Sequence, residues 1–222
     1  IPARRLYYRW LGRFVRKSLS LGPLTASFRV PTSIEADELA TFGGEKNVLE
    51  RFLSELPPGG AVWDIGANIG MWTLFCGAKL AGKGSVSAFE PDPHAREFLT
   101  RNIRLNRMRN IHIVPFALGS ETGRVNFFTG TQDTQVSGLT PKKGLHPTAR
   151  TGTDVQIMRA EDAVLQGIAP APHAAKIDVE GAELAVLRGF GEHAWATLQL
   201  LAIEVHPSLL AAMGGSPDEL ES

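Results

Sequence analysis

The chain has 222 residues, 43% hydrophobic and 21% charged, a composition typical of one well-buried globular domain. Its 23 basic and 23 acidic side chains give a formal net charge of zero, so no overall field favours nucleic acid or an anionic membrane. The single Cys76 excludes a disulfide within the chain and a cysteine cluster for zinc. No apolar run approaches the about 20 residues that span a bilayer, and no signal-peptide pattern is present, so we expect a cytoplasmic protein.

The first 44 residues predict a lead-in to the main domain. Residues 1–20 combine basic side chains with aromatic and aliphatic ones, which predicts a basic amphipathic helix. This helix would lie on a membrane surface or bind a partner, or it would pack on the domain with its arginines in water. Residues 23–44 predict a loop with a short strand at Ser27–Val30. The chain begins with Ile1 rather than Met, which indicates a fragment, and we place the main domain at residues 45–222.

From residue 46 onward, short apolar runs alternate with helical patterns, which predicts βαβ units and an α/β fold with a parallel sheet. The predicted strands are Ala61–Ile65, Ser85–Glu90, Asn110–Phe116, Gly123–Phe128, Asp154–Arg159, Ala174–Val179 and Leu198–Val205. Pro115 predicts an edge position for the third strand, whereas the strongly apolar last strand is expected to be buried on both faces. The long segment 129–152, rich in polar residues, glycine and proline, predicts a functional loop.

A glycine turn follows the first strand of this domain. In the turn Gly66–Gly70 a ligand can approach bare backbone and point negative groups at free N–H groups of the next helix. The turn departs from the dinucleotide fingerprint G-x-G-x-x-G, because Asn68 and Met71 replace two of the glycines. The pattern D-x-G-x-N-x-G instead resembles the first motif of S-adenosylmethionine methyltransferases, in which Asp64 would attract the ammonium end of the donor.

Acidic side chains follow several of the predicted strands. Glu90 closes the second strand, where an acid is the usual partner of ribose hydroxyls, although a turn acid in water would also explain it. Asp178 stands near the end of the predicted strand Ala174–Val179, and Glu204 near the end of the last one. Because ligands bind beyond the carboxyl ends of parallel strands, this clustering favours a ligand site.

Five segments in this order resemble the FkbM family of methyltransferases over roughly residues 46–207: VWDIGANIGMWTL, FEPDP, VPFALGS, KIDVEGAELAVLRG and AIEVHP. The resemblance implies a class I methyltransferase fold, which is a Rossmann-like three-layer sandwich with a mostly parallel sheet. It also implies methyl transfer from S-adenosylmethionine to a hydroxyl group of a sugar, glycolipid or natural product. The donor-binding residues that it implies are Asp64, Gly66, Ala67, Asn68 and Gly70 at the methionine end, Glu90 at the ribose, and the backbone near Ala117 and Leu118 at the adenine.

The chain departs from the family in two places. The class I fold ends with two further strands, one of them antiparallel, and nothing after about residue 207 predicts them, so these C-terminal strands would be missing. The segment Met158–Asp162 also lacks the usual pairing of a leucine with an acid.

Methyl transfer needs alignment of an in-line displacement and, for a weakly nucleophilic hydroxyl, a base. Asp178 is the first candidate for the base or for acceptor orientation, with capping of the following helix as its alternative role. Glu180 has the same alternative role. His206 is the base in a second version, acting at its ordinary pKa, and Glu204 alternates with it across Val205 so that both face one side of the strand end.

Asp178, Glu204 and His206 would in a further alternative hold a divalent cation that lowers the pKa of the acceptor hydroxyl. We assign no residue as a metal ligand on this spacing alone. Lys176 is expected to point inward from its strand and to partner an acid.

Two other function classes compete with methyl transfer. An NAD-type oxidoreductase would share the sheet and Glu90, but Asn68 and Met71 argue against it, and the only tyrosines, Tyr7 and Tyr8, lie in the basic N-terminal segment. A non-catalytic binding module would keep the fold and dock through residues 1–20, but it would not need clustered strand-end acids. Nucleic acid is not expected as a partner, because basic residues cluster only at the N-terminus.

Overall fold

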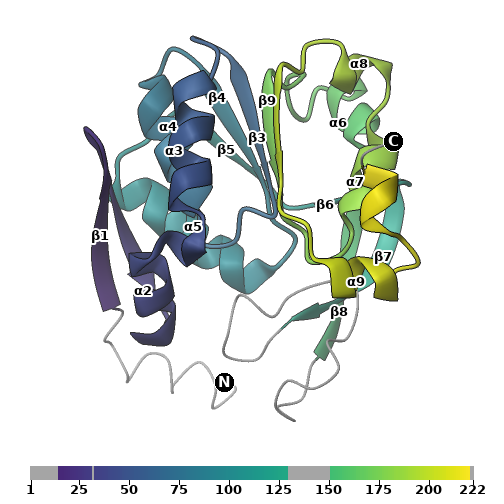
Figure 1. Ribbon diagram of the computed structural model, residues 1–222, viewed down its shortest axis with the longest axis horizontal. Helices are drawn as coiled ribbons and strands as arrows, with labels where there is room; N and C mark the ends of the chain where they lie inside the picture. Colours follow the sequence, from purple (N-terminus) through teal and green to yellow (C-terminus); the bar gives the residue numbers. More distant parts are fainter. Residues whose placement is uncertain (1–14, 32, 130–150, 221–222) are drawn as a thin grey trace.

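The computed structural model describes residues 15–31, 33–129 and 151–220, and its centre is a parallel sheet between two layers of helices (Figure 1). Five strands form this sheet in the order β10-β9-β3-β4-β5, and all neighbouring pairs are parallel. They are β3 (Ala61–Ile65), β4 (Ser85–Phe89), β5 (Ile111–Val114), β9 (Ala174–Ile177) and β10 (Leu200–Ile203). The predicted α/β fold with a parallel sheet is therefore confirmed.

Helices cover both faces of the sheet, as Figure 1 shows. One layer consists of α3 (Lys46–Glu55), α4 (Met71–Leu80) and α5 (Pro93–Leu105), and the other of α6 (Ala160–Leu165), α7 (Glu183–Gly189) and α8 (Glu192–Trp195). Each layer has its own hydrophobic core, one around Phe75 of α4 and one around Trp63 of β3. This arrangement is the expected three-layer sandwich, and the burial of its two cores supplies the main driving force for folding.

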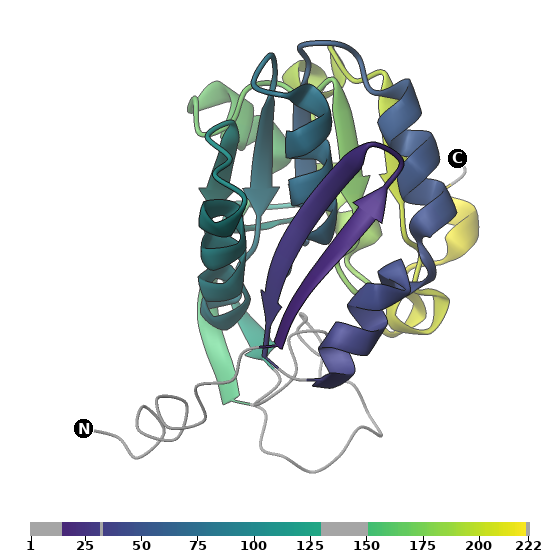
Figure 2. The same cartoon turned by 90° about the vertical axis from the view of Figure 1, so that its left-hand side faces the viewer.

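The N-terminal segment differs from its prediction. Strands β1 (Val15–Leu21) and β2 (Leu24–Val30) form an antiparallel hairpin that lies across α4 and α5, as Figure 2 shows. The predicted basic helix is therefore wrong for residues 15–20, whereas residues 1–14 lie outside the described part. Leu19 and Leu21 are buried while Ser18 and Ser20, which alternate with them, are exposed, so the apolar period is that of a strand.

The hairpin shares a core with the main domain. Phe28 is fully buried, with its ring 6.5 Å from that of Phe75. The buried Asn102 of α5 accepts a hydrogen bond from Arg29 N at 2.7 Å and donates one to Ile69 O at 2.9 Å. The hairpin is followed by α2 (Ser33–Ala40) and η1 (Phe42–Gly44), where the sequence predicted a loop. The strand expected at Ser27–Val30 is confirmed and is longer than predicted.

A second, smaller sheet lies beyond the end of β5. It contains β6 (Ala117–Leu118), β7 (Gly123–Thr129) and β8 (Thr151–Met158) in the order β6-β8-β7. The pair β6/β8 is parallel and the pair β7/β8 antiparallel, so the sheets together are mostly parallel, as predicted. Residues 130–150, which form most of the expected functional loop, lie outside the described part.

The edges of the central sheet agree with one prediction and contradict another. β5, next to Pro115, is an edge strand as expected. β10 is the opposite edge, and its four residues are only half-buried, so the expectation of burial on both faces is wrong. Up to residue 220, β10 is followed by α9 (Pro207–Ala212) and η3 (Pro217–Leu220) without a further strand. Among the described helices, none has the length and apolar character to cross a membrane.

Candidate active site

A pocket of about 470 Å³ lies at the carboxyl ends of β3, β9 and β10, and its opposite wall comes from α2, η1 and the start of α3. The predicted site residues that line it are Asp64, Gly66, Ala67, Asn68, Asp178, Glu204 and His206. The other predicted residues, Gly70, Glu90, Ala117 and Leu118, are not part of this lining. Strand ends that are far apart in the sequence therefore meet at one site, as expected for a parallel sheet.

The glycine turn after β3 is held tightly by the backbone around it. Gly66 N and Ala67 N both donate hydrogen bonds to Phe89 O at 3.0 Å. Gly66 has a φ of +85°, and a Cβ at this position would overlap the carbonyl oxygen of Asp178. This glycine is therefore required by the close approach of the ends of β3 and β9 as well as by its left-handed backbone.

Two buried oxygen atoms in the pocket wall have no hydrogen-bond partner among the described residues: Asp64 Oδ1 and Asn68 Oδ1. The other carboxylate oxygen of Asp64 accepts a hydrogen bond from the Thr73 hydroxyl. Asp64 is 1% exposed, and burial raises the pKa of its carboxyl group, whereas Lys176 acts in the opposite direction. Buried acceptors without donors are costly, so both atoms are suited to a ligand that carries N–H groups.

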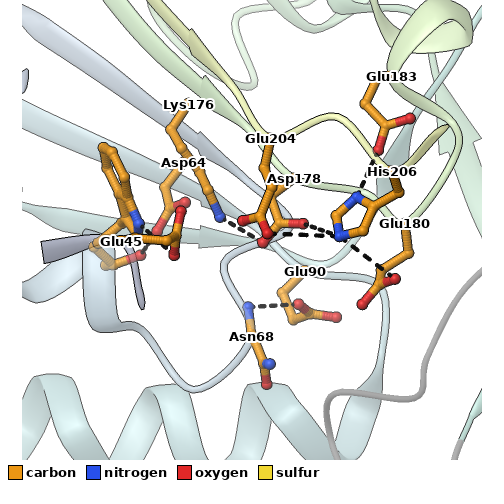
Figure 3. Close-up of polar contacts among 12 residues, drawn as sticks. Glu45, Asp64, Asn68, Glu90, Lys176, Asp178, Glu180, Glu183, Glu204 and His206 are labelled. Atoms are coloured by element: carbon orange, nitrogen blue, oxygen red, sulfur yellow. Dashed lines mark hydrogen bonds and ion pairs between the residues drawn. The ribbon is translucent and has the colours of Figure 1, made fainter. Parts of the chain in front are cut away.

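Glu90 joins the glycine turn to the end of β4. Its Oε2 accepts a hydrogen bond from Asn68 N at 2.7 Å (Figure 3). Its Oε1 accepts one from Asp92 N at 2.8 Å. Burial raises the pKa of the Glu90 carboxyl group to about 7, although these two hydrogen bonds favour its ionised form. Each carboxylate oxygen has a second lone pair, so the ribose role predicted for Glu90 remains a prediction that this geometry permits.

Lys176 and Asp178 form an ion pair at the end of β9. Lys176 Nζ lies 2.8 Å from Asp178 Oδ2 and 5.7 Å from the centroid of the Trp72 ring. Burial alone would lower the pKa of Lys176, but the carboxylates of Asp178, Asp64 and Glu45 raise it well above its usual value. The prediction that Lys176 points inward and partners an acid is confirmed.

The capping role considered for Asp178 is not found. Helix α7 begins after Ala182, and this N-cap position has no side-chain capping hydrogen bond. The side chain of Asp178 is instead directed at Lys176, as Figure 3 shows. Asp178 and Glu180 both line the pocket.

Glu45 is a pocket residue that sequence reasoning missed. It precedes α3, and its Oε2 accepts a hydrogen bond from Trp72 Nε1 at 3.1 Å. Burial raises the pKa of Glu45 to about 7, Lys176 and the Trp72 hydrogen bond lower it, and the neighbouring Glu204 carboxylate raises it further. No local sequence pattern predicts this position of Glu45, because its contact with Trp72 depends on how α3 packs against α4.

His206 stands at the centre of a ring of carboxylates (Figure 3). Its Nδ1 lies 3.1 Å from Oε1 of the buried Glu183, and its Nε2 lies 3.6 Å from Glu204, 3.8 Å from Glu180 and 3.9 Å from Asp178. The hydrogen bond to Glu183 and the other three carboxylates raise the pKa of His206 to about 9, against the opposing effect of burial. His206 therefore carries a proton at neutral pH when the pocket holds no other cation.

The carboxylates and the imidazole are also close enough to surround a single ion. One donor atom from each of Asp178, Glu204 and His206 lies within 4.8 Å of the other two. Asp178 already has a cationic partner in Lys176, and His206 already carries a proton. The divalent cation considered from the sequence remains an alternative on this geometry.

Residues 64–221 match the family model described as the methyltransferase FkbM domain. The hexuronic acid methyltransferase AglP of Haloferax volcanii is 28% identical over 184 residues, which cover 82% of this chain and 70% of that protein. The 31-O-demethyl-FK506 methyltransferase FkbM of Streptomyces tacrolimicus is 31% identical over 179 residues, which cover 68% of this chain and 67% of that protein.

A solved precorrin-6y C5,15-methyltransferase from Geobacter metallireducens aligns with a TM-score of 0.45 and 16% identity, over 76% of this chain and 68% of that one. The match to the family model extends through the glycine turn, the ion pair of β9 and the carboxylate ring around His206. The chain therefore belongs to the FkbM family of S-adenosylmethionine-dependent methyltransferases.

Proposed function

We propose that this protein transfers a methyl group from S-adenosylmethionine to a hydroxyl group of a sugar or of another hydroxylated natural product. The observation that carries the proposal is the content of one pocket. Two buried acceptor atoms without partners, on Asp64 and Asn68, face the same space as a histidine nitrogen surrounded by carboxylates. The first feature suits the amino-acid end of the donor, and the second suits removal of a hydroxyl proton.

The donor would lie along the glycine turn. It supplies a methyl group activated by a sulfonium. The residues that we assign to it are Asp64, Gly66, Ala67, Asn68 and Gly70 for the methionine end, Glu90 for the ribose, and Ala117 and Leu118 for the adenine. The carboxylates that line the pocket would stabilise the positive charge of the sulfonium, because a nearby cation offsets the repulsion among several negative charges.

His206 is the residue that we assign to the hydroxyl proton, in preference to Asp178. Asp178 is held in its ion pair with Lys176, whereas Nε2 of His206 has no partner closer than 3.6 Å among the described residues. A cation bound among the same carboxylates lowers the pKa of His206, because the carboxylates then stabilise a competing positive charge. Nε2 is then free to take the proton of the hydroxyl as its oxygen is methylated, while Asp178 and Glu204 orient the acceptor.

The names of two relatives support an oxygen acceptor. One relative is named for a hexuronic acid, and the other for position 31-O of demethyl-FK506. The segment 129–152 remains our prediction for the part of the chain that selects among such acceptors.

The experiment is a pair of measurements on the whole chain. Calorimetry with S-adenosylhomocysteine tests donor binding, and transfer of a labelled methyl group to the 4-nitrophenyl glycosides of glucose, glucosamine and glucuronic acid tests the reaction. We expect binding that Glu90→Ala weakens, and transfer that persists in EDTA. Binding of NADH instead would favour an oxidoreductase, donor binding without transfer would favour a non-catalytic module, and loss of transfer in EDTA would favour the metal alternative.

A further inference from the structure

Glu183 is a buried acid for which the proposed reaction has no direct use. Its side chain has 0% exposure in the first turn of α7. Oε1 accepts a hydrogen bond from Gly181 N at 2.9 Å and lies 3.1 Å from His206 Nδ1, while Oε2 has no partner among the described residues. A carboxylate with this burial is costly to keep, so the contact with His206 calls for a function.

The contact fixes which nitrogen of His206 faces the pocket. A carboxylate accepts hydrogen bonds, so Nδ1 of His206 must be the nitrogen that donates to Glu183. The hydrogen bond of one ring nitrogen decides the state of the other, and here it leaves Nε2 as the nitrogen that exchanges a proton. Nε2 is also the nitrogen that points at Asp178, Glu180 and Glu204, as Figure 3 shows.

Both partners are held by backbone rather than by flexible loops. His206 directly precedes α9, whose first residue is Pro207. Gly181 has a φ of +103°, and a Cβ there would overlap Leu209 of α9, so this glycine lets the start of α7 approach the start of α9. The approach brings Glu183 within reach of His206.

We infer that Glu183 is a positioning residue for His206: it holds the imidazole ring by Nδ1 and turns Nε2 into the pocket. The orientation follows from the contacts above, and its catalytic consequence rests on the proposed function. Without Glu183 the imidazole ring of His206 would rotate about its side-chain bonds. Either Nε2 or Nδ1 would then face the pocket, and the other nitrogen would face the protein interior. A misplaced base slows proton removal without changing how the donor is held.

The chain offers a matched control for this pair. Glu161 is a second buried acid that contacts a histidine, with Oε1 2.7 Å from Nδ1 of His193. Its carboxylate also accepts hydrogen bonds from the backbone N–H groups of His193 and Ala194 at the start of α8. Neither Glu161 nor His193 lines the pocket, so this pair reports what a purely structural acid–histidine contact does.

The test uses the full chain labelled with ¹⁵N-histidine, whose ring nitrogens report protonation and tautomer by NMR. The signal of His206 is identified by its loss in His206→Gln. We compare the wild type with Glu183→Met, which keeps the volume but removes the acceptor, with Glu183→Gln, which removes only the charge, and with Glu161→Gln. The other five of the six histidines show whether each variant keeps its fold.

In the wild type we expect Nδ1 of His206 to stay protonated while Nε2 loses its proton near pH 9. In Glu183→Met we expect a mixture of tautomers and a titration midpoint lowered by at least about one pH unit, whereas Glu161→Gln changes only His193. An unchanged His206 spectrum in folded Glu183→Met or Glu183→Gln would overturn the inference and confine Glu183 to the Gly181 turn.

The kinetic arm uses whichever 4-nitrophenyl glycoside the wild type methylates. We expect Glu183→Met to lower kcat about 10- to 100-fold, with KM for the glycoside and the affinity for S-adenosylhomocysteine changed less than about threefold. A loss that appears only in KM, or an equal loss in Glu161→Gln, would contradict a positioning role. If the wild type methylates none of the glycosides, the proposed acceptors fail, and the NMR comparison still decides the orientation of His206.

Discussion

Lys176 and Asp178, two residues apart at the end of β9, form an ion pair of 2.8 Å in the pocket wall, in which Lys176 is buried and Asp178 is partly exposed. Lys176 also faces Asp64 and Glu45, so one ammonium group offsets three carboxylates. This arrangement holds the Asp178 side chain in place, and the positive charge of Lys176 offsets the negative charges on this side of the pocket.

Replacing Lys176 by Met should destabilise the folded protein by about 3 kcal/mol, because it leaves buried carboxylates without their cation. The loss falls at the lower end of the usual range since Asp178 keeps some contact with water. Urea unfolding at pH 7 measures the effect. Lys46→Met, which removes only the exposed ion pair with Glu50, is the control and should leave the unfolding midpoint unchanged. Equal midpoints for the two variants would show that the ion pair of β9 contributes nothing to stability.

Glu45 should make the protein less stable as the pH rises. Its pKa is about 7 in the folded state and 4.5 in the unfolded state, so the unfolded chain releases the proton first. The contribution of Glu45 to stability is therefore complete below pH 4.5 and is lost as the pH passes through 7. We compare the free energy of unfolding of Glu45→Gln with that of the wild type at each pH. This difference should be more favourable to the variant at pH 8.5 than at pH 4.5 by roughly 1 kcal/mol, after allowance for the partial exposure of Glu45.

Urea unfolding of wild type and Glu45→Gln at the two pH values measures this difference. Glu50→Gln, on the exposed side of α3, serves as the control and should show no such pH dependence. A difference between Glu45→Gln and the wild type that is the same at both pH values would mean that Glu45 is ionised normally in the folded protein.

Donor binding should release a proton from His206. At pH 8 His206 is still protonated, with a pKa of about 9, while Glu45, with a pKa of about 7, is already ionised. A sulfonium bound near Asp178, Glu180, Glu183 and Glu204 lowers the pKa of His206, so the proton leaves. Calorimetry in Tris and in phosphate at pH 8 measures the release from the difference in observed enthalpy.

S-adenosylhomocysteine provides the matched ligand, because it differs only in lacking the methyl group and the sulfonium charge. We expect a larger proton release with S-adenosylmethionine than with S-adenosylhomocysteine, and no difference between the two ligands in His206→Gln. The same release for both ligands in the wild type would place the sulfonium away from His206.

Glu90 should make donor affinity rise with pH, in the same direction as the proton release from His206. Its pKa of about 7 means that the carboxyl group takes up a proton as the pH falls from 8 to 6. A protonated carboxyl group accepts fewer hydrogen bonds from ribose hydroxyls, so affinity for S-adenosylhomocysteine should fall over this range by about threefold to tenfold. Glu90→Gln should bind more weakly at pH 8 and lose most of the pH dependence. A pH profile that Glu90→Gln leaves unaltered would assign the titration to another group.

The meeting of strand-end acids in one pocket was predictable from the sequence. Parallel strands end at the same edge of a sheet, so Asp64, Asp178 and Glu204 were expected together once the βαβ pattern was recognised. The inward direction of Lys176 follows from the alternation of side chains along a strand.

The opposite wall was not predictable, because it depends on contacts between distant segments. Glu45 meets Trp72 only when α3 packs against α4, and neither residue belongs to a local pattern. Residues 15–20 were predicted as the end of a helix, because basic residues between apolar ones fit the helical period as well as that of the observed strand β1. The edge position of β10 depends on strand order, which an apolar run does not specify.

The central claim is methyl transfer to an oxygen with His206 as the base, and its most direct test is transfer of a ¹³C-methyl group from S-adenosylmethionine to the 4-nitrophenyl glycosides. NMR of the product identifies the atom that is methylated. We predict a methyl ether formed by the wild type, and a rate lowered at least about 100-fold in His206→Gln with an affinity for S-adenosylhomocysteine within about threefold of the wild type. Methylation of the glucosamine nitrogen, or an unchanged rate in His206→Gln, would contradict the account.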